Sequence, residues 1–155
     1  MKMIYNDGGR SKAGRKGTAN DCVCRSIAIA TGKPYKEIYD ALNELAKSER
    51  IGKRKRSKSS AREGVYKATY KKYLASIGWK WIPTMFIGSG CKIHLHDGEL
   101  PSGTLIVSLS RHLTCVIDGV IHDTHDPQRC TVFYENNKRV RIARRCVYGY
   151  WINNK

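Results

Sequence analysis

The spacing of apolar residues changes near Gly78, and this change constrains the fold more than any other feature of the sequence. Before Gly78, apolar residues recur at the spacing of amphipathic helices. The expected helices cover about 22–31, 34–46 and 65–77. After Gly78, short runs rich in β-branched and aromatic residues alternate with turn residues, which indicates strands. The expected strands are 79–82, 104–109, 112–117, 120–124, 131–134 and 140–151. Helices followed by strands predict an α+β fold, with N-terminal helices packed on a mostly antiparallel sheet.

Two short polar pairs predict hairpin turns. Asp118-Gly119 lies between two apolar runs, and Asn136-Asn137 lies between two later ones. A two-residue type I′ turn requires positive φ at both positions, which Asn, Asp and Gly tolerate best. The first pair is the strongest hairpin signal in the chain.

The length of 155 residues fits one domain. Residues 1–19 are rich in Gly, Lys and Arg and show no apolar periodicity, which predicts a flexible basic arm. The single domain is then expected over 20–155. Within it, residues 47–64 form a basic, polar segment that predicts an exposed loop.

The chain is strongly basic, with 29 Lys and Arg against 13 acidic residues and a formal net charge of +16. Such an excess attracts polyanions. The densest cationic run gives the candidate nucleic-acid-binding residues: Lys53, Arg54, Lys55, Arg56 and Lys58. A solvated loop face is the alternative interpretation, since no sequence-specific reader motif accompanies the run.

Six cysteines occur in a chain without a recognisable secretion signal or an apolar span of about 20 residues. We therefore expect a cytoplasmic protein with no membrane span, whose cysteines are thiols or a nucleophile and not a disulfide framework. His94 and His96, near Cys91, resemble a metal pair only by spacing, and a polar loop is the preferred interpretation. The sequence predicts no metal and no cofactor.

Cys22 stands in the first turn of the first expected helix. Unpaired N–H groups and the positive end of the helix dipole favour a thiolate there. Cys24 lies about 200° further round the helix, at ~3.6 residues per turn, so we expect it in the core. A small buried hydrophobe is the alternative interpretation of Cys22.

A thiolate nucleophile needs an imidazole and a group that orients it. If Ile117 pairs with Val120 across the predicted turn, His112 falls opposite His125 and lies diagonal to Asp123 on the same face of the sheet. Asp118 and Asp126 are the rival carboxylates. The hairpin thus supplies both a base, His112, and its partner.

Three segments resemble small phage and bacterial proteins of the papain-like cysteine-peptidase class. They are Asn20–Gly32, Ser110–Leu113 and Ile117–Thr124. The resemblance implies a papain-like fold and hydrolysis of a peptide or isopeptide through a thioester on Cys22, with His112 as acid and base. That family has an amide side chain, commonly Gln, before the nucleophile, and this chain lacks it. Asn20 and the Cys22 N–H are the substitutes for the oxyanion site.

Two other functions remain open at this stage. A noncatalytic phage protein, virion-associated or directed at a host component, would use the same fold and bind nucleic acid or another partner through its charge. A transferase would resolve the thioester with an amine instead of water.

Overall fold

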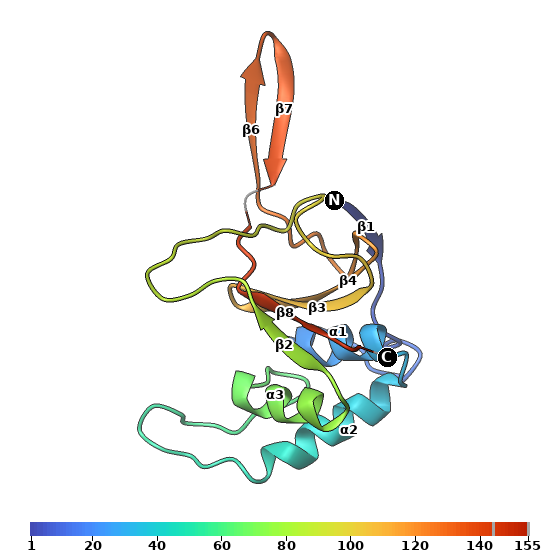
Figure 1. Ribbon diagram of the computed structural model, residues 1–155. Helices are drawn as coiled ribbons and strands as arrows, with labels where there is room; N and C mark the ends of the chain where they lie inside the picture. The colour runs from blue at the N-terminus through green and yellow to red at the C-terminus, as the bar shows by residue number, and fades with distance from the viewer. Residues whose placement is uncertain (144, 155) are drawn as a thin grey trace.

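The computed structural model describes residues 1–143 and 145–154 and has an α+β fold (Figure 1). The three predicted helices are present as α1 (Cys22–Thr31), α2 (Tyr35–Ala46) and α3 (Lys67–Ser76). The strands are β1 (Lys2–Tyr5), β2 (Lys80–Pro83), β3 (Thr104–Leu109), β4 (His112–Ile117), β5 (Val120–Asp123), β6 (Cys130–Glu135), β7 (Lys138–Ala143) and β8 (Gly149–Ile152).

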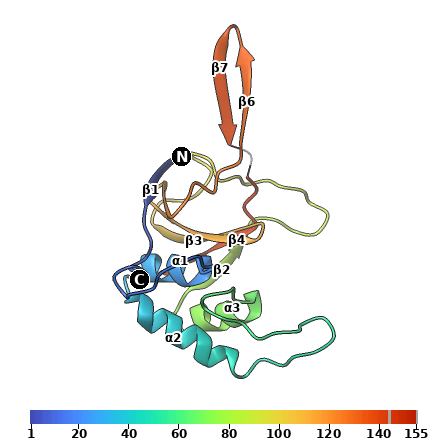
Figure 2. The same cartoon turned by 180° about the vertical axis from the view of Figure 1, so that it is seen from behind.

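Six of the strands form one mixed sheet in the order β1-β5-β4-β3-β8-β2. Only the pair β1–β5 is parallel, so the sheet is mostly antiparallel as predicted. Helix α1 packs against β4 and β3, and α2 packs against α1. Figures 1 and 2 show all three helices on one side of this sheet.

Both predicted hairpin turns are present. Asp118 and Gly119 have φ values of 46° and 77°, and Ile117 pairs with Val120. Asn136 and Asn137 have φ values of 49° and 61° and join β6 to β7. The first of these turns fixes the register of β4 and β5, on which the candidate site depends.

The expected single strand over 140–151 is wrong. Its first part is β7, which pairs with β6 in a separate two-stranded sheet. Its second part is β8, which lies between β3 and β2 in the large sheet. One straight strand cannot serve both sheets, so the extended run is divided.

The N-terminal residues do not form the flexible arm that the sequence predicted. Residues 2–5 are strand β1 at the edge of the large sheet, with Tyr5 paired to Asp123. The Asn6 N–H donates to the Asp123 carbonyl at 2.9 Å. Gly8 then passes so close to α1 that a Cβ on it would lie 3.0 Å from the Arg25 carbonyl oxygen. Long-range pairing therefore orders a segment that has no apolar periodicity of its own.

Buried apolar side chains cover both faces of the large sheet. On the helix face, Ile106 and Trp151 pack with Ile27, Leu42 and Leu74 of the three helices. A second cluster lies on the opposite face of the sheet. Its buried members are Leu95, Leu105, Val107, Leu109, Val116, Ile121 and Val147. Neighbouring residues of β3 thus alternate between two cores, as expected for a sheet buried on both sides.

None of the helices in the described part of the chain is both long and apolar enough to cross a lipid bilayer.

Candidate active site

Cys22 is the first residue of α1 and is partly buried, whereas Cys24 is completely buried. The Cys24 thiol approaches the Tyr35 carbonyl at 3.7 Å in the core. Burial raises the pKa of Cys24 to about 12. The two thiols therefore have different surroundings, as the helical spacing predicted, and only Cys22 lines a cavity.

His112 is the first residue of β4, and it connects Cys22 to Asp123. Its Nε2 donates to Asp123 Oδ2 at 2.7 Å. The Cys22 thiol interacts with the same ring, which lowers the pKa of the thiol, and both side chains line one cavity. Since Nε2 faces Asp123, Nδ1 is the nitrogen available to the sulfur. The structure thus brings together the three residues that hairpin register and helix position had selected.

The three groups shift one another's protonation. Burial raises the pKa of Cys22, but the interaction with His112 outweighs burial, and the pKa is lowered. Burial lowers the pKa of His112, but the hydrogen bond to Asp123 and the interaction with Cys22 raise it to about 9. Burial raises the pKa of Asp123, but His112 favours the charged form, and the pKa falls to about 2. Each group of the three therefore favours the charged form of its neighbour.

A buried ionic network stands behind Asp123, and sequence reasoning missed it. Arg25, one turn after Cys22 on α1, pairs with Asp21 and lies 3.4 Å from Asp123 Oδ1. Asp21 also accepts a 2.6 Å hydrogen bond from the Tyr35 hydroxyl. Asp21 and Asp123 are 1% and 3% exposed, so both carboxylates need these partners. The i, i+4 spacing of Asp21 and Arg25 was the available signal.

The network also affects the start of α1. Asp21 directly precedes this helix, but its side chain makes no capping hydrogen bond. The carboxylate is held instead by Arg25, Tyr35 and, at 3.3 Å, Arg10 Nε. The first N–H groups of the helix are therefore left without a side-chain cap next to the Cys22 sulfur.

The rival carboxylates lie elsewhere. Asp118 accepts a 2.8 Å hydrogen bond from the Gly103 N–H, and Asp126 accepts one of 2.9 Å from the Gln128 N–H. His125 stacks near His112 with ring centroids 4.9 Å apart, as the register predicted, but its side chain is 61% exposed. Its Nδ1 is 3.9 Å from Asp123 Oδ1, so it is a distant neighbour of the same carboxylate.

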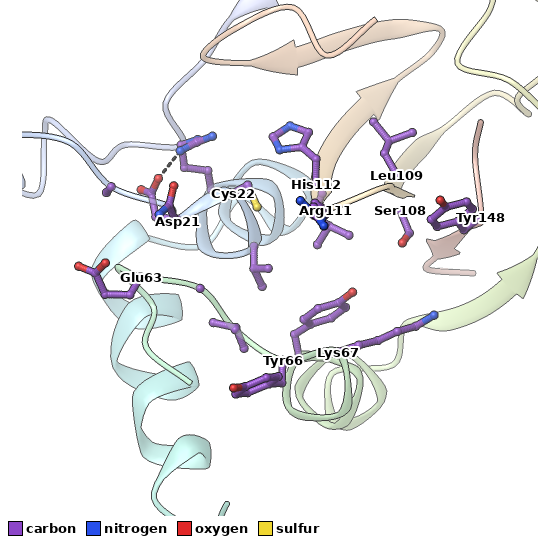
Figure 3. A pocket seen from close by; sticks show the side chains of 18 of the residues that line it. Asp21, Cys22, Glu63, Tyr66, Lys67, Ser108, Leu109, Arg111, His112 and Tyr148 are labelled. Atoms are coloured by element: carbon purple, nitrogen blue, oxygen red, sulfur yellow. Dashed lines mark hydrogen bonds and ion pairs between the residues drawn. The ribbon is translucent and has the colours of Figure 1, made fainter. Parts of the chain in front are cut away.

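The Cys22–His112 pair opens into a cavity of about 590 Å³ (Figure 3). One wall is the N-terminal end of α1, and another is the turn between β3 and β4, with Ser108 and Arg111. The facing wall is the chain that enters α3, with Tyr66 and Lys67. Asn20, the predicted oxyanion residue, is exposed and also lines this cavity. The cavity therefore gives a substrate access to the thiol from solvent.

The basic segment 47–64 is a loop without helix or strand, as expected, but only part of its charge is free. Lys53, Arg54 and Arg56 are exposed. Lys55 is partly buried, 3.2 Å from Glu49 and with its Nζ over the Tyr66 ring at 4.3 Å. Lys58 is exposed, and its Nζ donates to the Lys47 carbonyl at 2.9 Å.

Glu49 organises this loop, which the sequence did not indicate. Its carboxylate accepts hydrogen bonds from the Ser59 N–H (2.6 Å) and hydroxyl (2.5 Å) and from the Thr69 hydroxyl. Burial opposes ionisation, but these bonds together with Lys55 lower the pKa of Glu49 to about 2. The loop is therefore anchored to the start of α3, which forms the cavity wall.

The expectation that the chain has no disulfide is wrong for one pair. Cys91 and Cys146 are bonded, with Cα atoms 5.8 Å apart. Their approach joins two loops 55 residues apart, which spacing along the sequence does not indicate. His94 Nδ1 lies 3.2 Å from Glu99, and the described residues contain no cluster of three or more His, Cys, Asp or Glu suited to a metal ion.

Comparisons of this chain with protein-family models, with curated proteins and with solved structures found no match.

Proposed function

We propose that this protein is a thiol hydrolase in which Cys22 is the nucleophile, His112 the acid and base, and Asp123 the residue that orients His112. The observation that carries the proposal is the hydrogen bond between His112 and Asp123, with Cys22 close enough to His112 to interact with it, at the wall of an open cavity. A buried structural cysteine would need neither an ionised neighbour nor access to solvent.

The reaction follows from the placement of the protons. The Cys22 thiolate attacks the carbonyl carbon of an amide, and His112, already protonated, gives its proton to the departing amine. This leaves an acyl thioester on Cys22 and a neutral imidazole. His112 then takes a proton from water, whose oxygen attacks the thioester, and the carboxylic acid and the free thiolate–imidazolium pair result.

Asp123 and the buried ionic network behind it orient the ring of His112. The bond from Nε2 to Asp123 leaves Nδ1 for the sulfur, and the 2.7 Å hydrogen bond from the Thr124 N–H fixes the carboxylate. For the oxyanion of the tetrahedral intermediate, we propose the Cys22 N–H and the Asn20 amide as donors. Both belong to the end of α1 that lines the cavity.

We propose that the protein has a papain-like fold and that its substrate is a peptide or an isopeptide. The order of Cys at a helix start, His at a strand start and Asp on the next strand supports that assignment. The cavity lies between the N-terminal end of α1, the chain that enters α3 and the turn from β3 to β4.

The first experiment measures the alkylation rate of every cysteine against pH by mass spectrometry. We expect Cys22 to react fastest, with a rate that persists below pH ~7, because its pKa is lowered. His112→Ala should slow Cys22 alone. Cys24 is an internal control, because its pKa is raised. Asp126→Asn is a second control, because it removes a carboxylate that does not contact His112.

A second measurement tests turnover. With p-nitrophenyl acetate, the wild-type protein should release a burst of p-nitrophenolate, acetylate Cys22 and then release acetate. Cys22→Ala should abolish the burst while the circular dichroism spectrum stays unchanged. Equal acetylation of Cys22 and Cys130, or a burst that survives in Cys22→Ala, would contradict the proposal.

Polyanion binding by the basic loop is a second candidate function. Three of its five predicted cations, Lys53, Arg54 and Arg56, are exposed. Replacing them with Gln should reduce the salt dependence of binding to a nucleic acid by about one per lost phosphate contact. An unchanged salt slope would remove the loop from this function.

A further inference from the structure

The hairpin of β6 and β7, residues 130–143, is called the arm below. It forms a two-stranded sheet of its own, outside the six-stranded sheet that carries Cys22's partners. Figures 1 and 2 show the arm projecting from the body of the molecule on the side opposite the helices. Neither the fold nor the proposed hydrolysis requires a projecting hairpin.

The arm exposes large apolar side chains that the body of the molecule does not cover. Val132, Phe133 and Tyr134 are consecutive on β6, and Tyr134 is 74% exposed. Side chains at consecutive strand positions point to opposite faces, so β6 presents large apolar groups to solvent on both faces of the hairpin. An isolated two-stranded hairpin is also only marginally stable in water. The arm therefore has the properties of a segment that is completed by a partner.

The charge of the arm identifies the chemistry of that partner. The sequence from 129 to 145 contains six Lys or Arg and one acidic residue. Arg145 is engaged at the base, donating to the carbonyls of Ser110 and Pro127 at 2.7 and 2.9 Å. Lys138 and Arg139, next to the turn, are exposed. The free end of the arm is thus cationic and favours a polyanion.

The dimensions of the arm favour duplex DNA among polyanions. Two paired strands lie about 4.8 Å apart, and six residues of strand extend about 20 Å. The major groove of B-DNA, about 12 Å wide and about 8.5 Å deep, admits a two-stranded ribbon. The tip presents Asn136, Asn137 and Arg139, whose amide and guanidinium groups bind base edges and phosphates. An apolar tip would instead have indicated a protein partner.

We propose that the arm inserts its Asn136-Asn137 end into the major groove of duplex DNA, with Lys138 and Arg139 contacting phosphates or base edges. This function is separate from the proposed hydrolysis at Cys22. The Arg145 contact to Ser110 fixes the base of the arm to the turn before His112, while the tip of the arm projects away from the body that holds the cavity.

The test measures binding of the full chain to a fluorescein-labelled 20-base-pair DNA duplex over a range of salt concentrations. Lys138→Gln combined with Arg139→Gln should raise the Kd roughly tenfold or more and lower the salt slope by about two. The matched control, Lys71→Gln with Lys72→Gln, removes the same charge from the exposed side of α3, on the side of the molecule opposite the arm. We expect this control to keep the salt slope of the wild-type protein to within about one half.

A second comparison tests the mode of binding. An RNA duplex of the same sequence should bind more weakly, because its deep, narrow major groove does not admit the arm. Arg139→Lys should restore salt dependence lost in Arg139→Gln. Equal losses in the two charge variants, equal affinity for the RNA duplex or for poly-glutamate, or binding that the arm variant leaves unchanged would each overturn the proposal. Circular dichroism and the alkylation rate of Cys22 check that the variants are folded.

Discussion

Replacing Asp123 by Asn tests whether a carboxylate sets the charge of His112. Asn keeps the size of the side chain but loses the negative charge that lies 2.7 Å from His112 Nε2. In the wild type, burial lowers the pKa of His112, but this hydrogen bond and the interaction with Cys22 outweigh burial and raise the pKa from 6.5 to about 9. We therefore expect the imidazole of the variant to lose its proton at a lower pH.

The size of the effect follows from the contacts. The whole shift of His112 corresponds to roughly 3 kcal/mol in favour of the imidazolium. An opposite charge at this distance typically contributes a pKa change of roughly 1 to 3. If the pKa falls by about 2, the imidazolium fraction at pH 7.5 falls from nearly all to about a quarter. Cys22 then loses much of its thiolate, and its alkylation at that pH slows.

The assay is an NMR titration of the His112 ring between pH 5 and 10. Wild type, Asp123→Asn and Asp126→Asn are compared, the last being an exposed carboxylate bound to Gln128. A wild-type pKa at or below 6.5 would refute the reasoning, as would an unchanged pKa in Asp123→Asn. A similar change in Asp126→Asn would assign the effect to general charge instead of the hydrogen bond.

The same variant makes a prediction for acid stability. The pKa of Asp123 is lowered from 3.8 to about 2, so its charged form stabilises the folded state above pH 3.8. That stabilisation is lost as the pH falls through about 2, and it amounts to roughly 2 kcal/mol. Asp123→Asn should lack this part of the decline in the free energy of unfolding, measured with urea at pH 5 and pH 2.

Three further predictions concern stability. Arg25→Met should lower the free energy of unfolding by about 3 kcal/mol, because it leaves two buried carboxylates without their shared partner, and urea unfolding at pH 7 measures it. Gly149→Ala should cost about 1 to 3 kcal/mol in the same assay, since its Cβ would lie 2.4 Å from the Trp81 ring. Cys91→Ser should lower stability by roughly 4 kcal/mol, because the bond to Cys146 closes a loop spanning 55 residues, and dithiothreitol should destabilise the wild type but not this variant.

The parts of the site that were predictable depend on local rules. The start of α1 near Cys22 follows from the spacing of apolar residues, and the register of His112 follows from one turn, Asp118-Gly119. Once Ile117 pairs with Val120, the two-residue period of a strand places Asp123 on the face of His112. A few residues of local sequence thus determine a contact between α1 and the sheet.

The parts that were missed depend on contacts between distant segments. The Cys91–Cys146 bond joins two loops, and nothing near either cysteine signals the other. Arg25 is only 8% exposed, because Asp123, 98 residues later, lies against it. Charge in a sequence indicates solvent exposure by default, and only the fold shows which charges are buried in pairs.

Strand β1, which the sequence analysis did not predict, pairs with β5, the strand that carries Asp123. Deleting residues 1–5 removes the strand that pairs with β5 through Asp123 and exposes that edge of the sheet. We expect the deletion to lower stability and to slow alkylation of Cys22 at pH 7, because Asp123 loses its fixed backbone. Tyr5→Ala is the control, since it trims a side chain that is 71% exposed and leaves the backbone pairing intact. Unchanged Cys22 reactivity and stability after the deletion would mean that these residues are the loose basic arm that the sequence alone predicts.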